Sequence, residues 1–442
     1  MAGSRGVRRA LRWGLRHGMI RRAVRKQVAA GDLGARLMID PAVIAEPFAH
    51  YDELRRRGPL VDTGLVRISA HHDIVSAVLR SADFGVALRM PEDLPGIVKL
   101  AVKAGGRWPL GPVEPPSMLA VDPPDHTRYR KLVTRAFSAR AVAALRTRTE
   151  QIAAELLDGL TARAAEDGRG DLIEDYAALL PATVIAEMLG APVAMRRQFL
   201  EWGAGAALSL DVGLSFRDFQ RSERDIDALH SWMLGHFDEI RRDPADTILS
   251  TLVAAHDKDG ALTGDELSSI AMLLLAAGFE TTVNLIGSGA GLLMAHPEQL
   301  AVLQAEPEHW SNAIDEMLRI ESPVQRTGRV AIRDTEVAGL AVPAGTSVVT
   351  LIGGANRDPA VFPDPARFDV TRPEAGQHVA FSGGVHYCLG AGLARMEGEV
   401  ALRALFDRFP RLAPAGPAHR RPTRVLRGYD SLPVTLRTPV SA

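Results

Sequence analysis

Residues 267–294 form an apolar run with a clear helix start and a clear helix stop. Thr263 and Glu266 have the spacing of a capping box, and His296 followed by Pro297 ends the run. At 1.5 Å per residue such a helix extends for roughly 45 Å. Because it is apolar on nearly every side, we expect it to cross the interior of the molecule, with the other elements packed around it.

A polar cluster interrupts this run near its centre. Ala277 and Gly278 are followed by Glu280, Thr281 and Thr282. Glycine lets a neighbouring group approach the backbone, and a threonine hydroxyl can hydrogen-bond to the carbonyl one turn back and distort the helix. A carboxylate is costly to bury in apolar surroundings. From the residues alone, Glu280 either pairs with a buried arginine or serves a function.

The only cysteine of the chain, Cys388, lies in the glycine-rich stretch at residues 381–390. Residues 389–409 have helical apolar spacing, so the cysteine would stand at a helix N-terminus. That position favours a thiolate, which is the form that binds metals and attacks carbon. A lone cysteine is more often a small buried hydrophobe, and the stretch by itself does not decide between the two interpretations.

Composition narrows the class of protein. Of the 442 residues, 46% are hydrophobic and 5% aromatic, which favours a mainly helical globular protein over an all-β architecture. A single cysteine excludes internal disulfides, cysteine-rich zinc sites and cysteine-ligated iron–sulfur clusters. The formal net charge of −1 produces no field that would attract nucleic acid.

The first 31 residues differ from the rest of the chain. They contain nine Arg or Lys and no acid, and their apolar residues recur at roughly helical spacing. This predicts a basic amphipathic extension, residues 1–31, ahead of a single domain at residues 32–442. The segment lacks the apolar core of a signal peptide. We expect either a solvated arm or a peripheral anchor on an anionic membrane, which would use Trp13 and the arginines.

Three other segments carry less specific signals. Residues 126–149 contain no acid and seven Arg or Lys, and are expected to form one helix. Its basic face is either solvated, or clamps carboxylates, or docks an acidic protein. Residues 84–116 are irregular and rich in glycine and proline, which is typical of a binding loop or lid. Residues 203–213 are mostly small, which is typical of a flexible lid.

An ion-pair motif follows the long helix. Glu316 and Arg319 lie one helical turn apart, close enough to pair. Arg329 then leads into a predicted β-hairpin with its turn at residues 343–345, and a proline-rich coil ends at Arg372. Alone, the Glu–Arg motif has little predictive value.

Together these features resemble the cytochrome P450 superfamily, the haem-thiolate monooxygenases, and in particular its soluble bacterial members. The resemblance covers almost the whole chain and rests on three motifs in the family's order. They are Phe381-x-x-Gly384-x-His386-x-Cys388-x-Gly390, Ala277-Gly278-x-Glu280-Thr281-Thr282, and Glu316-x-x-Arg319 with Arg372. The resemblance implies the P450 fold, mainly α with small β-sheets, with the haem between the long central helix and the helix that follows the cysteine.

The resemblance implies roles for the residues around the haem. Cys388 would be the axial thiolate of a haem b iron, with Phe381 shielding the sulfur and Gly384 permitting close approach to the ring. The amides of Leu389 and Gly390 would donate to the sulfur. The two haem propionates would be bound by four basic side chains: His126, Arg130, Arg329 and His386.

On the opposite side of the haem, the resemblance assigns the oxygen-activating role to the central helix. Glu280 and Thr281 would form the acid–alcohol pair that relays protons to bound dioxygen, beside Ala277 and Gly278. Glu316, Arg319 and Arg372 would form a structural ion-pair triad. Two positions depart from the family pattern. Ser382 stands where many members have glycine, and Gln325 is polar where the pocket is often apolar, so that it would contact either substrate or backbone.

The implied activity is insertion of one atom of dioxygen into a C–H bond or alkene of a lipophilic small molecule. Electrons would come from a ferredoxin and its reductase, because the chain has no flavin or nicotinamide domain. Arg128, Lys131 and Arg135 are candidates for docking the ferredoxin, with a solvated face as the alternative. We expect a cytoplasmic monomer that binds no nucleic acid. Two alternatives stay open: a peroxide-dependent peroxygenase, which Glu280 and Thr281 disfavour, and a non-catalytic haem protein that senses or carries a gas.

Overall fold

The structure is a computed structural model that describes residues 2–64, 66–86, 110–258 and 260–436. Most of the predicted binding loop at 84–116 therefore lies outside the described residues. The helices of the first half of the chain are α1 (Ala2–Trp13), η1 (Gly14–Gly18), α2 (Met19–Ala29), α3 (Leu33–Ile39), α4 (Pro41–Ala45), α5 (Phe48–Arg57), α6 (His72–Arg80), α8 (Asp125–Val133), η2 (Thr134–Phe137), α9 (Ala139–Arg163), η3 (Ile173–Ala177), α10 (Leu179–Leu189), η4 (Val193–Met195) and α11 (Arg196–Leu208). Those of the second half are α12 (Phe216–Arg242), α13 (Ile248–Asp257), α14 (Gly264–Ala295), α15 (Pro297–Ala305), η5 (Pro307–His309), α16 (Trp310–Ile320), α17 (Ile352–Ala355), η6 (Ala375–Gln377), η7 (Gly384–His386) and α18 (Ala391–Arg408).

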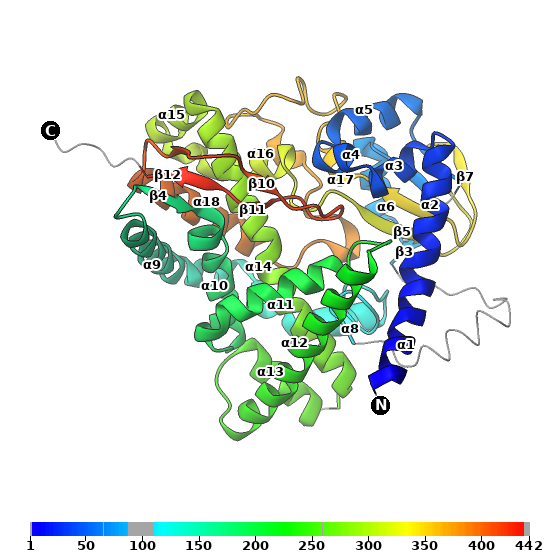
Figure 1. The fold of residues 1–442 in the computed structure, drawn as a ribbon, viewed down its shortest axis with the longest axis horizontal. Helices are drawn as coiled ribbons and strands as arrows, with labels where there is room; N and C mark the ends of the chain where they lie inside the picture. Colours follow the sequence, from blue (N-terminus) through cyan, green and yellow to red (C-terminus); the bar gives the residue numbers. More distant parts are fainter. Residues whose placement is uncertain (1, 65, 87–109, 259, 437–442) are drawn as a thin grey trace.

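The central helix is α14, which passes through the middle of the molecule (Figure 1). Its capping box is formed, because the Thr263 hydroxyl accepts from the Glu266 amide and the Glu266 carboxylate accepts from the Thr263 amide. Within the described part of the chain, α14 is the one helix long and apolar enough to cross a membrane. In this structure 72% of its most apolar window is buried inside the protein, so it is a core helix.

Two hydrophobic clusters meet on α14. Residues 267–279 pack with side chains of α10, α11, α12 and α13. Residues 283–293 pack with side chains of α9, α10, α16 and α18. The polar cluster Glu280, Thr281 and Thr282 lies between these two halves. The expectation of a buried crossing helix is thus confirmed, and its polar interruption coincides with the boundary between the two clusters.

The β-structure is small and divided among separate short sheets: β3, β5 and β7 lie on the right of the central helix in Figure 1, and β4 and β12 lie on the left. A five-stranded sheet has the order β1-β2-β8-β5-β3, with β2 and β8 parallel and the other neighbours antiparallel. The strands are β1 (Val61–Asp62), β2 (Arg67–Ser69), β3 (Phe84–Gly85), β4 (Arg169–Asp171), β5 (Thr327–Ala331), β6 (Thr335–Val337), β7 (Leu340–Val342), β8 (Ser347–Thr350), β9 (Ala413–Pro414), β10 (His419–Arg420), β11 (Tyr429–Ser431) and β12 (Pro433–Thr435).

Two predicted elements differ from the structure. The tight hairpin after Arg329 joins β6 to β7, where Ala338 and Gly339 have φ of 54° and 74°, whereas residues 343–345 connect strands of different sheets. The expected single helix at 126–149 is two helices, α8 and α9. Ser138 breaks it, since its backbone is extended and its hydroxyl caps α9 by accepting from the Ala141 amide at 3.4 Å.

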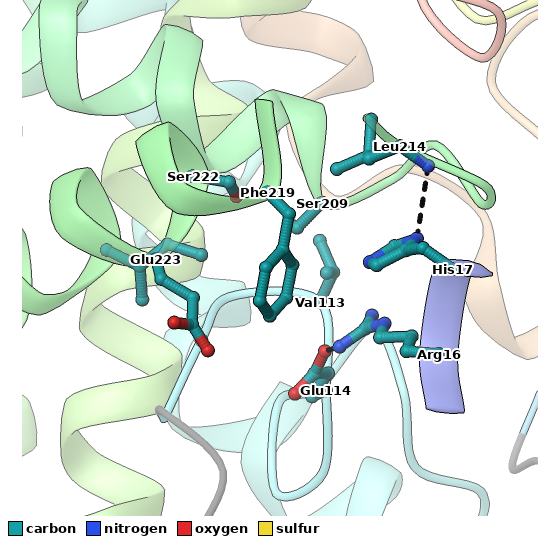
Figure 2. A pocket seen from close by; sticks show the side chains of 11 residues that line it. Arg16, His17, Val113, Glu114, Ser209, Leu214, Phe219, Ser222 and Glu223 are labelled. Carbon is teal, nitrogen blue, oxygen red and sulfur yellow. Dashed lines mark hydrogen bonds and ion pairs between the residues drawn. The ribbon is translucent and has the colours of Figure 1, made fainter. Parts of the chain in front are cut away.

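The N-terminal extension is helical, as predicted, but it is not a solvated arm. Arg9 and Arg12 form ion pairs with the Glu223 carboxylate of α12, at 2.6 Å and 2.8 Å. His17 is buried, and its Nδ1 accepts from the amides of Gly213 and Leu214 (Figure 2). The expected membrane anchor would have used Trp13 and the arginines, and of these Trp13, Arg9 and Arg12 contact the protein instead: the Trp13 indole donates to the Leu214 carbonyl at 2.9 Å.

Arg16 completes this contact from the same face of the extension. Its guanidinium pairs with the Glu114 carboxylate (Figure 2). The extension therefore joins the segment before α8 to the connection between α11 and α12, through charged groups that the sequence suggested were free. Three of the nine basic residues at 1–31, Arg9, Arg12 and Arg16, are thus paired with acids from distant parts of the chain.

Candidate active site

The cysteine loop is a tight turn between η7 and α18. The Cys388 amide donates to the Phe381 carbonyl at 2.9 Å, which closes the loop. The Gly390 amide donates to the Cys388 thiol, whereas no such bond is found for the Leu389 amide within the described residues. Helix α18 begins at Ala391, three residues after the cysteine. Burial raises the pKa of the Cys388 thiol, while the Gly390 amide and the charges of Arg130 and Arg395 lower it.

The Cys388 side chain has accessible surface although protein surrounds the residue. The residue is therefore not enclosed on all sides by packed side chains. Phe381 lies nearby and is half-buried, with the Arg395 guanidinium 4.6 Å from its ring centroid. The inert-hydrophobe interpretation requires a packed thiol, and the structure does not have one.

Gly384 and Ser382 shape the loop through left-handed backbone, each with φ of 63°. A Cβ on Gly384 would lie 2.6 Å from the Leu79 carbonyl oxygen at the end of α6. The glycine is thus required by contact with α6, whatever its relation to a ligand. Ser382 adopts this backbone conformation at a cost in free energy. Its hydroxyl accepts a hydrogen bond from the Arg329 guanidinium at 3.3 Å.

Four basic side chains from α8, β5 and η7 gather at the cysteine loop. The rings of His126 and His386 are 4.3 Å apart, and Arg329, on β5, is 5% exposed. Burial and the charge of Arg130 lower the pKa of His126. Burial, with the charges of His126 and Arg329, lowers the pKa of His386 to about 4. The four residues that the sequence grouped therefore influence one another electrostatically.

This cluster contains less negative charge than positive charge. Burial lowers the pKa of Arg329 to about 10, and its hydrogen bonds go to Thr327, the Gly328 carbonyl and Ser382 rather than to a carboxylate. The buried Nε2 of His386 makes no hydrogen bond among the described residues, and Asp122 Oδ1 lies 3.8 Å from it. Such a cluster fits a ligand that carries carboxylates.

The middle of α14 has accessible surface on one side. Ala277 is exposed and Gly278 and Thr281 are half-buried, although Phe279, Glu280 and Thr282 are buried. The Thr281 hydroxyl donates to the Ala277 carbonyl at 3.3 Å, one turn back, as the sequence suggested. A Cβ on Gly278 would lie 2.6 Å from Ile185, so this glycine admits helix α10.

Glu280 pairs with an arginine, which is one of the two interpretations that the sequence allowed. Its carboxylate pairs with the Arg421 guanidinium, which comes from the segment between β10 and β11. Sequence reasoning did not find Arg421, because it lies 141 positions from Glu280 in a stretch with several arginines and no motif. Asp122 was missed for the same reason: nothing in its neighbourhood indicates that it faces His386.

Glu316 lies between Arg319 and Arg372 and pairs with both. The Arg319 Nε–Glu316 Oε2 distance is 2.6 Å and the Arg372 Nε–Glu316 Oε1 distance is 3.2 Å. Arg319 and Glu316 are fully buried. The remaining donors of both arginines bind backbone carbonyls of residues 356–367. The triad therefore fixes the proline-rich coil against α16.

Two further residues that the sequence singled out, Gln325 and Arg128, are bound by other groups of the protein. Gln325 is buried, its amide donates to the Ser322 carbonyl and its carbonyl accepts from Tyr51, so it contacts backbone and core. Arg128 pairs with Glu266 at 2.7 Å and with Asp125 at 3.0 Å. Lys131 and Arg135 are exposed, and neither has an ion pair within the described ranges.

The residues present fit a haem. A haem offers a flat macrocycle, an iron that takes a thiolate ligand and two carboxylates. The accessible Cys388 thiol and the cluster of His126, Arg130, Arg329 and His386 supply matching groups for the iron and the carboxylates. Among the described residues no group of three or more His, Cys, Asp or Glu could hold a metal without such a ligand.

Comparisons with known proteins agree with this chemistry. The sequence profile of the family described as Cytochrome P450 matches residues 208–423. The chain is 47% identical to the putative cytochrome P450 140 of Mycobacterium tuberculosis, over 96% of this chain and 97% of that protein. It is 44% identical to the 6-deoxyerythronolide B hydroxylase of Saccharopolyspora erythraea, over 71% of this chain and 76% of that protein.

Solved structures agree as well. A myxobacterial cytochrome P450 crystallised with myristic acid superimposes with a TM-score of 0.79 at 35% sequence identity, covering 90% of this chain and 98% of that one. This confirms the expected fold, mainly helical with small sheets. Sequence identity over nearly the full length, the shared fold and the thiolate loop lead to one conclusion: the chain belongs to the cytochrome P450 family, as a bacterial haem-iron monooxygenase.

Proposed function

We propose that the chain is a ferredoxin-dependent monooxygenase that carries haem b and oxidises a lipophilic small molecule. The observation that carries the proposal is the pairing of an accessible cysteine with a cluster of four basic side chains that has Asp122 as its one carboxylate neighbour among the described residues. When bound, the haem supplies the iron chemistry by which dioxygen is activated. Everything else depends on how the protein's own side chains hold the haem and handle protons.

Cys388 is assigned as the thiolate ligand. The Gly390 amide and the charges of Arg130 and Arg395 favour the ionised sulfur and partly oppose the larger effect of burial, which raises the thiol pKa. His126, Arg130, Arg329 and His386 would bind the propionates, and those carboxylates would offset the positive charges of Arg130 and Arg329. With haem bound, Phe381 and the glycine turn would shield the sulfur from water.

Thr281 and Glu280 are assigned to proton handling. The Thr281 hydroxyl lies on the accessible side of α14 and already hydrogen-bonds within the helix, so it can exchange that bond for one to a ligand. Glu280 is an ionisable group in an otherwise apolar helix, which a proton supply into a dry pocket requires. Two relatives support a lipophilic substrate: one is named a 6-deoxyerythronolide B hydroxylase, and the other was crystallised with myristic acid.

The decisive test of haem ligation is spectroscopic. The reduced protein under carbon monoxide should show the strongly red-shifted Soret band of a thiolate adduct, and Cys388→Ser should abolish it. A wild-type spectrum typical of histidine-ligated haem would refute the assignment of Cys388.

The ferredoxin part of the proposal rests on exposed basic residues near the start of α9. Arg135 is exposed with no ion pair among the described residues, whereas Arg128 is held by Glu266 and Asp125. Arg135→Glu should therefore slow reduction by ferredoxin, and added salt should slow the wild type similarly. Arg408→Glu, at the end of α18 and paired with Asp158 near the opposite end of α9, serves as the control. Equal reduction rates for both variants and wild type would exclude Arg135 from the docking surface.

A further inference from the structure

The segment between β10 and β11 reaches the centre of α14 and meets it at Glu280. Its backbone turns back on itself, with the Arg421 amide donating to the Gly428 carbonyl at 3.1 Å. Gly428 packs against Asn284, one turn after Glu280, with no room for a Cβ. The close approach of this segment brings the Arg421 guanidinium to the Glu280 carboxylate.

Arg421 is held by more than the carboxylate. Its Nε donates to the Tyr429 carbonyl at 3.3 Å and lies 3.0 Å from Asp430 Oδ1. The Glu280 side chain is 5% exposed, the Arg421 side chain 16% and the Asp430 side chain 56%. The three charged groups thus form a continuous line from the protein interior to the surface.

The surroundings show why this arrangement matters for a buried acid. The other charge that acts on Arg421 is Arg221 of α12, which pairs with Asp225 at 3.6 Å and repels the Arg421 guanidinium. Glu280 has Arg421 as its one ionic partner among the described residues. An arginine keeps its proton, so it cannot itself relay protons. It can fix the position of a carboxylate and keep it ionised.

We propose that Arg421 is a positioning residue for the reaction: it holds the Glu280 carboxylate in place, and Asp430 holds Arg421 from the surface side. The inference rests on the proposed role of Glu280 in proton handling. It assigns the part of the chain between β10 and β11 a function that its sequence does not indicate. Loss of Arg421 would leave Glu280 buried, without its partner and without a fixed orientation.

The first measurement tests the pair without using catalysis. Urea unfolding of the haem-loaded protein is compared for wild type, Arg421→Gln, Glu280→Gln and the double variant. Arg421→Gln should raise the equilibrium constant of unfolding roughly 100-fold or more, since it strands a buried charge. Adding Glu280→Gln should reverse most of that loss. Strictly additive effects would overturn the proposed pairing.

The second measurement tests the positioning role. With myristic acid as the probe, the ratio of oxidised product to released peroxide is measured for the same proteins. Arg421→Gln should lower this ratio roughly tenfold or more, as loss of a positioned acid does. Arg421→Lys should restore much of it. The matched control is Arg420→Gln, which removes the neighbouring arginine that pairs with Glu321 at 3.2 Å and does not contact Glu280. A ratio for Arg421→Gln equal to that of Arg420→Gln would overturn the role.

The two failures can be told apart. If Glu280→Gln leaves the product-to-peroxide ratio unchanged, the proton role of Glu280 is wrong, and the proposal for Arg421 falls with it even when the unfolding cycle shows coupling. If Glu280→Gln lowers the ratio and Arg421→Gln does not, the proton role stands and only the positioning by Arg421 is refuted.

Discussion

At the scale of single residues, the cysteine loop needs a glycine at position 384 because the neighbouring helix α6 leaves no room for a side chain there. Gly384 has φ of 63°, and a Cβ there would meet the Leu79 carbonyl oxygen at 2.6 Å. The clash is with backbone, which cannot rotate away as a side chain can. The same loop contains Gly390, with φ of −87° and open space around the position that a Cβ would take, with no contacting atom within 4 Å.

We therefore expect Gly384→Ala to lower the free energy of unfolding by about 2 kcal/mol or more, from backbone strain and the clash together. Gly390→Ala is the matched control and should change the free energy of unfolding by less than about 1 kcal/mol. Urea unfolding monitored by circular dichroism measures both. Equal effects of the two substitutions would show that the close contact with α6 is not what requires Gly384.

A second residue-scale prediction concerns Glu397 on α18. It is fully buried, both carboxylate oxygens lack a hydrogen-bond partner among the described residues, and burial raises its pKa well above the usual 4.5. Because the folded state holds a proton that the unfolded chain releases above pH 4.5, this group costs stability increasingly as pH rises from 4.5 towards its folded pKa.

Glu397→Gln removes the ionisation and should make the protein more stable than wild type at pH 7 to 8, with a smaller difference at pH 5. Unfolding by urea at several pH values measures this. Glu399→Gln, two positions along α18 and paired with Arg146 at 3.1 Å, is the control and should not produce the same pH-dependent gain. If the difference in free energy of unfolding between wild type and Glu397→Gln does not change with pH, the raised pKa of Glu397 is contradicted.

At the scale of elements, the N-terminal extension is attached by a buried histidine. Burial, with the charges of Arg16, Arg424 and Arg21, lowers the pKa of His17 to about 3 from 6.5. Its neutral Nδ1 accepts from two amides of the α11–α12 connection. A histidine with a lowered folded-state pKa contributes stability that is complete above pH 6.5 and declines as pH falls towards 3.

The extension should consequently detach more readily in acid. We expect proteolytic cleavage within residues 1–31 to accelerate as pH falls from 7 to 4.5, measured with a protease whose rate on a peptide substrate corrects for its own pH dependence. His17→Asn can place an amide oxygen near the Nδ1 position and should weaken this pH dependence. His309 pairs with Glu306 at the surface, and His309→Asn should leave the pH dependence of cleavage unchanged. Cleavage independent of pH in the wild type would refute the role of His17.

At the scale of the whole molecule, the triad joins the helical core to the coil that leads to the cysteine loop. Arg319 donates to Glu316 and to carbonyls of Asn356, Pro365 and Arg367, in an environment without solvent. Lysine has a single ammonium and cannot make these bonds together. The connection between α16 and the proline-rich coil therefore depends on the guanidinium geometry.

Arg319→Lys should lower the free energy of unfolding by about 3 kcal/mol or more, because buried partners are left unsatisfied. It should also reduce the fraction of protein that retains haem. Arg367→Lys, with a side chain 62% exposed and 3.5 Å from Asp369, is the control and should change stability little. Thermal unfolding and haem content per protein measure the outcome. A stable, haem-replete Arg319→Lys variant would show that the triad is dispensable.

Much of the fold could be predicted because it depends on local patterns. The apolar run at 267–294 and its capping box predict α14, since burial on all sides and a satisfied N-terminus need no knowledge of neighbours. The break at Ser138 and the position of the tight β6–β7 turn were missed. At both positions several local conformations are equally acceptable, and contacts with the rest of the protein select one of them.

The amino-acid sequence by itself determined the central helix, the cysteine loop and the Glu316–Arg319 pair, because short-range spacing specifies each of them, and the resemblance carried by its motifs indicated the family and the third triad member, Arg372. Tertiary structure alone decided which distant charges meet: Glu280 with Arg421, the basic extension with Glu223 and Glu114, and Asp122 with His386. The physical reason is that charge pairing is set by proximity in space. A chain with 52 basic and 53 acidic residues allows far more pairings than its spacing can distinguish.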